Sequence, residues 1–204
     1  IMGRAIPSTG GRISGFCAFE RGRYVIGNQL IDAEEVPYRV TEKLANFLPA
    51  SDVNLIKMGV REMLINAIEH GNLDITFSEK SAAMEQERYF QLINERQNDP
   101  SHSKKKVVID YIIDGNHSVF RITDEGKGFD HRRMMERAAK NSEDGTLAHG
   151  RGITLIRNIF DRVSFNAKGN QILLEKSFVH SSRSAECPPF RSPAAGSFQI
   201  SPSA

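Results

Sequence analysis

The chain has 204 residues, of which 39% are hydrophobic and 25% are charged, and its formal net charge is +2. This length fits one domain with additional segments, and the composition is sufficient for a hydrophobic core. The near balance of charge and the lack of a long basic stretch argue against nucleic acid as a partner. No apolar run approaches the roughly 20 residues that cross a bilayer. Cys17 and Cys187 match no metal or disulfide spacing, so we expect a cytoplasmic protein with no membrane contact.

At both ends of the chain the pattern of hydrophobic and polar residues is weak. Residues 1–21 are rich in Gly, Ser and Arg, and we interpret them as a flexible N-terminal segment. Residues 179–204 are rich in Ser, Pro and Ala, and such a segment buries too little apolar surface to offset its ordering entropy. We therefore predict a disordered C-terminal tail and a folded domain over residues 22–178.

The first part of the domain is predominantly helical in pattern. Residues 24–31 predict a short strand, and apolar spacing over 31–48 predicts a helix whose regular part begins near Pro37. Ser51-Asp52 offers an N-cap for a second helix, which Gly71-Asn72 closes.

The second part begins with a charged, helix-forming stretch at 74–106, which predicts an exposed helical insertion. Strands, hairpin turns and one further helix follow. The predicted elements are strands at 107–113 and 118–122, a helix at 153–160, and a final hairpin at 162–166 and 171–178. Helices first and then an antiparallel meander indicate an α+β, two-layer α/β sandwich, with helices on one face of a mixed, largely antiparallel sheet.

Three segments carry candidate chemistry, and the first is the helix VREMLINAIEHG. Glu62, Asn66 and His70 recur every four residues, so they share one stripe of that helix. An amide oxygen suits Mg²⁺, and a carboxylate one turn away can accept a proton from a hydroxyl or water. By itself the stripe also fits the solvated face of an amphipathic helix.

The second segment, TDEGKGFD, directly follows an apolar strand. Gly126 and Gly128 let the backbone turn tightly and approach a ligand closely. Asp124 at the strand end is an acceptor suited to an exocyclic amine such as that of adenine. Taken alone, the segment also fits a β-turn without a ligand.

The third segment, HGRGI at residues 149–153, stands immediately before a helix. Its backbone N–H groups and the helix N-terminus make an anion site suited to phosphate. It is not a P-loop, because GxxxxGK[ST] is absent.

Together, in this order, the three segments resemble the N, G1 and G2 boxes of the GHKL superfamily, whose members share the Bergerat ATP-binding fold. VREMLINAIEHGN, GRGITLI and DRVSFNAKGNQILLEK look most like the bacterial anti-sigma-factor serine kinases. The resemblance covers about residues 24–178.

The resemblance implies ATP and Mg²⁺ as cofactors, with Asn66 holding the metal, Glu62 acting as general base, and residues 131–149 forming a lid over the nucleotide. The implied ATP-binding residues are Asn66, His70, Asp124, Gly126, Gly128, Phe129, His149, Gly150, Arg151, Gly152 and Ile153. The implied partner is a protein: an anti-sigma-factor antagonist, a sigma factor or another regulator. A homodimer is also compatible with the resemblance.

The sequence departs from the short kinases at two points. Thr146-Leu147-Ala148-His149 stands where they often carry a lid arginine, and Gly169-Asn170-Gln171 stands where a Gly-Thr pair is frequent. Three functions therefore compete: a serine/threonine kinase, a nucleotide-gated module that sequesters a regulator with little catalysis, and a histidine-kinase-type catalytic domain. The last is disfavoured, because His70 lies inside the pocket helix and no upstream helix pair precedes it.

Overall fold

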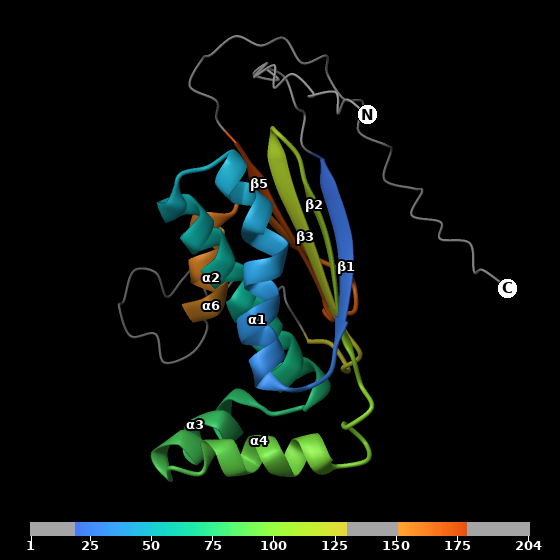
Figure 1. Cartoon of the computed structure of the whole chain (residues 1–204). Helices are drawn as coiled ribbons and strands as arrows, with labels where there is room; N and C mark the ends of the chain where they lie inside the picture. The colour runs from blue at the N-terminus through green and yellow to red at the C-terminus, as the bar shows by residue number, and fades with distance from the viewer. Residues whose placement is uncertain (1–18, 130–150, 179–204) are drawn as a thin grey trace, which may run out of the picture. The chain divides into compact units, whose positions relative to one another are not determined.

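A computed structural model describes residues 19–129 and 151–178 of the chain. Strands whose side chains alternate between buried and more exposed positions form one five-stranded sheet (Figure 1). Its order is β1-β2-β3-β5-β4, and every pairing among the described strands is antiparallel. The strands are β1 (Glu20–Ile26), β2 (Val107–Ile113), β3 (His117–Asp124), β4 (Arg162–Phe165) and β5 (Gln171–Ser177).

Three helices cover one face of this sheet: α1 (Leu30–Thr41), α2 (Ala50–Asn66) and α6 (Arg151–Ile159) (Figure 1). Each presents buried apolar residues three or four positions apart, as an amphipathic helix requires. On α6, for example, Ile153, Ile156 and Ile159 are buried. Together with the inward side chains of β2 and β3 they form one continuous core, which confirms the predicted two-layer α+β sandwich.

The predicted bounds of the first helix were wrong by several residues, and the predicted N-cap of the second helix was also wrong. Helix α1 starts at Leu30 and contains Pro37 in its interior. Burial of Ala33 and Val36 against the core favours helical backbone before the proline, although Pro37 donates no hydrogen bond. Helix α2 begins at Ala50 with Pro49 in the cap position, so Ser51 and Asp52 lie in its first turn rather than at its N-cap.

Helix α2 does not end as a regular α-helix. It passes into a π turn, η2 (Ala67–Asn72), in which the Leu73 N–H donates to the Ile68 carbonyl five residues earlier at 2.8 Å. Such turns occur frequently at functional sites. The predicted closure at Gly71-Asn72 is confirmed, but the last turn is wider than expected.

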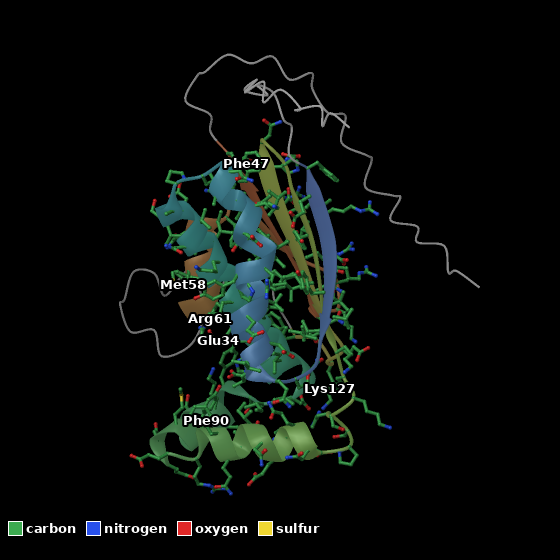
Figure 2. All side chains as sticks on the ribbon, in the orientation of Figure 1. Glu34, Phe47, Met58, Arg61, Phe90 and Lys127 are labelled. Atoms are coloured by element: carbon green, nitrogen blue, oxygen red, sulfur yellow. The ribbon has the colours of Figure 1, made fainter. Side chains whose placement is uncertain are left out.

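The predicted insertion forms two helices, α3 (Phe77–Glu85) and α4 (Tyr89–Asn98), at one end of the sandwich (Figure 1). Thr76 and Glu79 form a capping box that starts α3. Much of the pair is exposed, including Phe90 at 78% (Figure 2). Arg96 of α4 joins the two helices, because its Nη2 donates to Glu79 Oε1 of α3 at 2.6 Å. Its Nη1 donates to the Leu73 carbonyl at 3.3 Å, which attaches the pair to the segment after η2.

Strand β1 includes Glu20 and Arg21, which we had predicted to be part of the flexible N-terminal segment. The predicted tail at 179–204, the predicted lid at 131–149 and most of residues 1–21 lie outside the described part of the chain. No helix in the described ranges is long and apolar enough to cross a membrane.

Candidate functional site

A cavity of about 350 Å³ opens between α2, the ends of β3 and β5, the start of α6 and the insertion helix α3. We name its sides by the elements that supply them. The helix wall is Glu62, Asn66 and His70; the sheet wall is Asp124, Phe129, Phe165 and Asn170; the insertion wall is Phe77, Lys80, Ser81 and Met84. The remaining lining residues are Met63, Ala67, Gly71, Ile122, Gly128, Gly152, Ile153, Gly169, Gln171 and Ile172.

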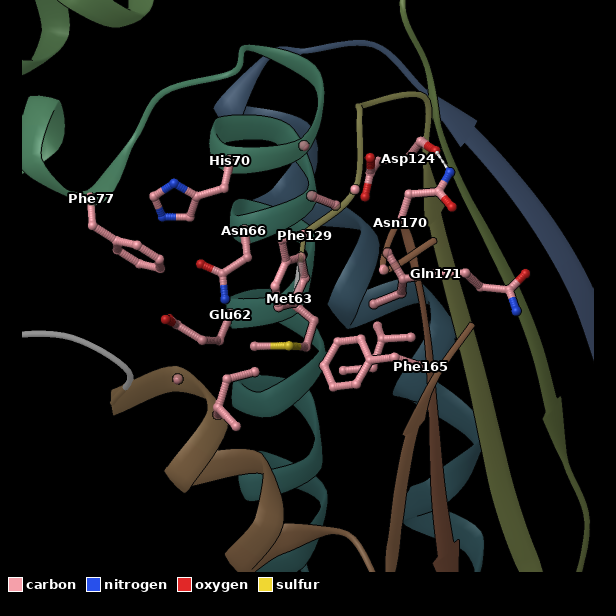
Figure 3. A pocket seen from close by; sticks show the side chains of 18 of the residues that line it. Glu62, Met63, Asn66, His70, Phe77, Asp124, Phe129, Phe165, Asn170 and Gln171 are labelled. Atoms are coloured by element: carbon pink, nitrogen blue, oxygen red, sulfur yellow. Dashed lines mark hydrogen bonds between the residues drawn. The ribbon is translucent and has the colours of Figure 1, made fainter. Parts of the chain in front are cut away.

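The helix wall has the arrangement that the sequence predicted. Glu62, Asn66 and His70 follow one another along the same face of the helix and extend toward the cavity (Figure 3). The next residue, Met63, is 4% exposed and contributes to the apolar interior. His70 itself lies in the π turn η2 and still lines the cavity.

A backbone carbonyl group fixes the orientation of the His70 ring. Its Nδ1 lies 2.5 Å from the Ile75 carbonyl oxygen, so Nδ1 carries the proton of the neutral ring. Burial lowers the pKa of His70 below its usual value, which favours this neutral form. The ring contacts Phe77 of the insertion wall, with 4.1 Å between the ring centroids.

Asp124 lies on the opposite side of the cavity, at the end of β3 (Figure 3). Its Oδ1 accepts a hydrogen bond from the Gly126 N–H at 2.8 Å. Burial is the main cause that raises the pKa of Asp124 to about 6, because the charged carboxylate loses hydration there. A ligand that donates a hydrogen bond to Oδ2 would replace part of the hydration that the carboxylate loses on burial.

Asn170 is the residue at the second departure from the kinase pattern, and the structure places it directly beside Asp124. Its Nδ2 donates to the Asp124 carbonyl at 2.7 Å, and its own carbonyl accepts from the Asp124 N–H at 3.0 Å (Figure 3). Its Oδ1 accepts from Asn166 at 2.9 Å. Asn170 therefore fixes the backbone of Asp124, a role that the sequence reading missed.

Gly126 and Gly128 differ in how they serve the site. Gly126 is buried behind Asp124 and does not line the cavity, whereas Gly128 does. Gly128 has a φ of +79°, which a residue with a side chain rarely adopts. This turn brings Phe129 against Phe165, edge to face with centroids 5.5 Å apart, and gives the sheet wall an apolar surface.

The third motif is described only in part. Gly152 and Ile153 line the cavity in the first turn of α6, and a Cβ at Gly152 would lie 2.6 Å from Glu62 Oε1. A side chain at position 152 would displace the Glu62 side chain, so glycine allows the helix start to lie against this carboxylate. Arg151 is the first residue of α6, whereas His149 and Gly150 lie outside the described residues.

The insertion wall was not predicted. Phe77, Lys80, Ser81 and Met84 line the cavity from α3, whereas the sequence predicted only an exposed helical insertion and assigned it no role. The one available signal was the spacing of these residues at three or four positions, which puts them on one helix face. That spacing does not identify what the face contacts.

Asn72 joins the helix wall to the loop after β3. It is fully buried, and its Oδ1 accepts from the Glu125 N–H at 2.9 Å while its Nδ2 donates to Asn28 at 2.8 Å. The end of η2 and the glycine loop are therefore held together without a ligand. This preorganisation keeps Asp124 and the helix wall at a fixed separation.

Residues 95–176 match a family model described as a histidine kinase-like ATPase domain. The match begins within α4 and extends through β2, the Asp124 loop and α6 into β5, but does not include Glu62 or Asn66. No curated protein matches the chain. The match supports a GHKL-type, ATP-binding domain, and the α+β sandwich is consistent with that fold.

Proposed function

We propose that this chain is a regulatory protein serine/threonine kinase of the anti-sigma-factor type, which transfers the γ-phosphoryl group of Mg-ATP to a partner protein. The observation that carries the proposal is the position of Glu62 and Asn66 on one wall of a cavity whose opposite wall holds Asp124. The partner would be an anti-sigma-factor antagonist, a sigma factor or another regulator. The match over residues 95–176 supports the ATP-binding part of this proposal.

Adenine would occupy the sheet wall. Asp124 Oδ1 already accepts from Gly126, so Oδ2 is the acceptor for the exocyclic amine of adenine. Phe129 and Phe165 supply apolar surface for the ring, together with the buried Ile122 and Ile172. Guanine carries a carbonyl oxygen where adenine carries its 6-amino group. In the same orientation two acceptors would then face each other at Asp124 Oδ2, so adenine would be preferred over guanine.

The phosphates would lie along the helix wall. Asn66 offers an amide oxygen, a ligand type that suits Mg²⁺, which takes its remaining oxygen ligands from phosphates and water. The metal would offset the charge on the phosphate oxygens. Glu62 lies one turn before Asn66 and beside the start of α6, where it would accept the proton of the attacking serine or threonine hydroxyl.

Removal of the Asn66 amide tests the nucleotide site. We expect Asn66→Ala to weaken Mg-ATP binding by roughly tenfold or more, since a ligand to the metal is lost. Calorimetric titration with ATP and Mg²⁺ measures this. Asn54→Ala, an exposed asparagine on the same helix, is the matched control and should bind as wild type does. Unchanged affinity in Asn66→Ala would refute the assignment of the pocket.

Neutralisation of Glu62 tests the reaction. Glu62→Gln should retain ATP binding but lose transfer of label from γ-³²P-ATP to candidate partners by about 100-fold or more. Glu35→Gln, an exposed carboxylate on α1, is the matched control. Persistent transfer in Glu62→Gln would contradict its role as the base.

The chemical stability of the labelled product separates the three competing functions. Phosphoserine and phosphothreonine survive acid, whereas phosphohistidine is hydrolysed in acid and survives alkali. Acid-stable label on the partner supports the kinase proposal. Acid-labile label would favour the histidine-kinase alternative, and nucleotide-dependent partner binding without label would favour the sequestering module.

A further inference from the structure

The insertion is a fixed part of the cavity. Besides the contacts of Arg96, Gln97 Nε2 donates to the Asn28 carbonyl at 2.6 Å, so α4 is attached to the loop that follows β1. The α3–α4 pair is also attached through Glu69 of η2, which is completely buried. The insertion wall is therefore preorganised at the edge of the helix wall.

The buried Glu69 carboxylate receives two donors from the insertion. Lys80 Nζ lies 2.5 Å from Glu69 Oε2, and the Tyr89 hydroxyl donates to Oε1. A buried carboxylate requires such partners, because an unpaired charge in the interior is strongly unfavourable. This pairing fixes the Lys80 ammonium group in one position at the cavity edge, where its side chain is 25% exposed.

The Lys80 ammonium group has further N–H donors that can bind a ligand. An ammonium group carries three N–H donors, and within the described residues Lys80 uses one of them, to Glu69. Lys80 belongs to the lining of the cavity, so the remaining donors are available to an anion that enters it. Glu69 therefore acts as the support that holds the cation in place.

The charge of the cavity favours this role. Among the described lining residues, Lys80 is the one Lys or Arg, while Glu62 and Asp124 are acidic. A triphosphate brings several negative charges and requires cationic partners as well as the metal. Lys80 Nζ pairs with Glu69, which directly precedes His70 of the helix wall. The ammonium group therefore lies beside the wall along which the phosphates would extend.

We propose that Lys80, supplied by insertion helix α3 and held by Glu69, is a binding residue for the phosphate chain of the nucleotide. This inference rests on the proposed ATP site and adds a residue that the core of the domain does not provide. The competing view is that Lys80 only neutralises Glu69. In that case its removal would affect stability and not the discrimination between nucleotides.

The test distinguishes ligand binding by the Lys80 cation from the structural pairing of Lys80 with Glu69. Lys80→Met alone would remove the cation that pairs with the buried Glu69 carboxylate, so the informative pair is Glu69→Gln and Glu69→Gln/Lys80→Met. The first retains the cation beside a neutral amide, and the second removes the cation without leaving a buried charge. Thermal unfolding of each variant establishes that it is folded before binding is compared.

Calorimetric titrations with ATP, ADP, AMP and adenosine then measure where the cation acts. Between the two variants, we expect the Kd for Mg-ATP to rise on the order of tenfold, as loss of a charge-assisted hydrogen bond predicts, and the Kd for adenosine to stay the same. Glu69→Gln/Lys80→Arg should recover most of the ATP affinity. Lys104→Met, an exposed lysine at the end of the insertion, is the control and should bind ATP as wild type does.

Two results would overturn the inference while leaving the proposed function intact: equal ATP affinity in the two variants, or equal weakening for ATP and adenosine. The failure of the proposed function itself is distinguishable, because wild type would then bind neither ATP nor adenosine. A selective loss for phosphorylated ligands, restored by arginine, supports the inference.

Discussion

The helix wall and the insertion wall border the same cavity but are held in place by different interactions. The helix wall belongs to α2, whose other face is buried in the core, where Val60 and Leu64 have no exposed surface. In the insertion, α3 and α4 each bury one residue, Ala83 and Ile93. Changes at the helix and sheet walls should therefore alter binding with the fold intact, whereas changes at the polar supports should loosen the insertion wall.

The largest effect is expected at Asp124 of the sheet wall. Asp124→Asn keeps an oxygen for the Gly126 N–H but replaces Oδ2 with an amide donor that faces the adenine amine. We expect ATP affinity to fall by roughly 100-fold. Titration with ATP measures this, and unchanged affinity would show that adenine does not contact Asp124.

The same variant has a defined pH dependence of stability. Because burial raises the pKa of Asp124 from 3.8 to about 6, the folded state retains its proton over a range where the unfolded chain has lost it. Ionisation therefore destabilises wild type as pH rises from about 4 to 6. Asp124→Asn should match wild type below pH 4 and exceed it above pH 6, by about 1 to 2 kcal/mol after allowance for partial exposure.

Urea unfolding at several pH values measures this difference. Asp74 and Asp110 have pKa values that their cationic partners lower, so they act in the opposite direction. Both proteins contain them, and their effect cancels in the comparison. A stability difference that is independent of pH would contradict a raised pKa at Asp124.

A smaller effect is expected at Tyr89, which supports the insertion wall. Tyr89→Phe removes one donor from the buried Glu69 while leaving Lys80 in place. We expect a loss of about 1 to 2 kcal/mol, because a buried carboxylate oxygen becomes unsatisfied. Hydrogen exchange should show faster exchange confined to α3 and α4, with the amides of β2 and β3 unchanged.

Tyr38→Phe is the control for this experiment, since Tyr38 is 62% exposed on α1. Tyr38→Phe removes a hydroxyl from a solvated site, so the free energy of unfolding should stay within about 0.5 kcal/mol of wild type. Equal effects in the two variants would show that the insertion does not depend on the Glu69 contact.

The difference between the walls also explains what the sequence could predict. Glu62, Asn66 and His70 share one helix, so their spacing alone indicated a common face, and the fold class followed from strand and helix patterns. The contact of Lys80 with Glu69 depends on how α3 turns back after the loop at Asp74, which has a φ of +54°. No local periodicity encodes that return. Asn170 was visible only as a departure from a pattern, and its contact with Asp124 required the register of β3 and β5.

The smallest effect is expected at Arg61, which precedes Glu62 in sequence but lies toward the outer side of the helical layer. Its guanidinium pairs with Glu34 of α1, and both side chains are more than a third exposed (Figure 2). Solvent screens such a pair, so Arg61→Met should lower stability by about 0.5 kcal/mol or less. ATP affinity should not change, because Arg61 does not line the cavity. Urea unfolding and ATP titration on the same protein test both statements. A marked loss of ATP affinity without a loss of stability would mean that the helix wall responds to charge on its outer side, and the separation between the two faces of α2 would then be wrong.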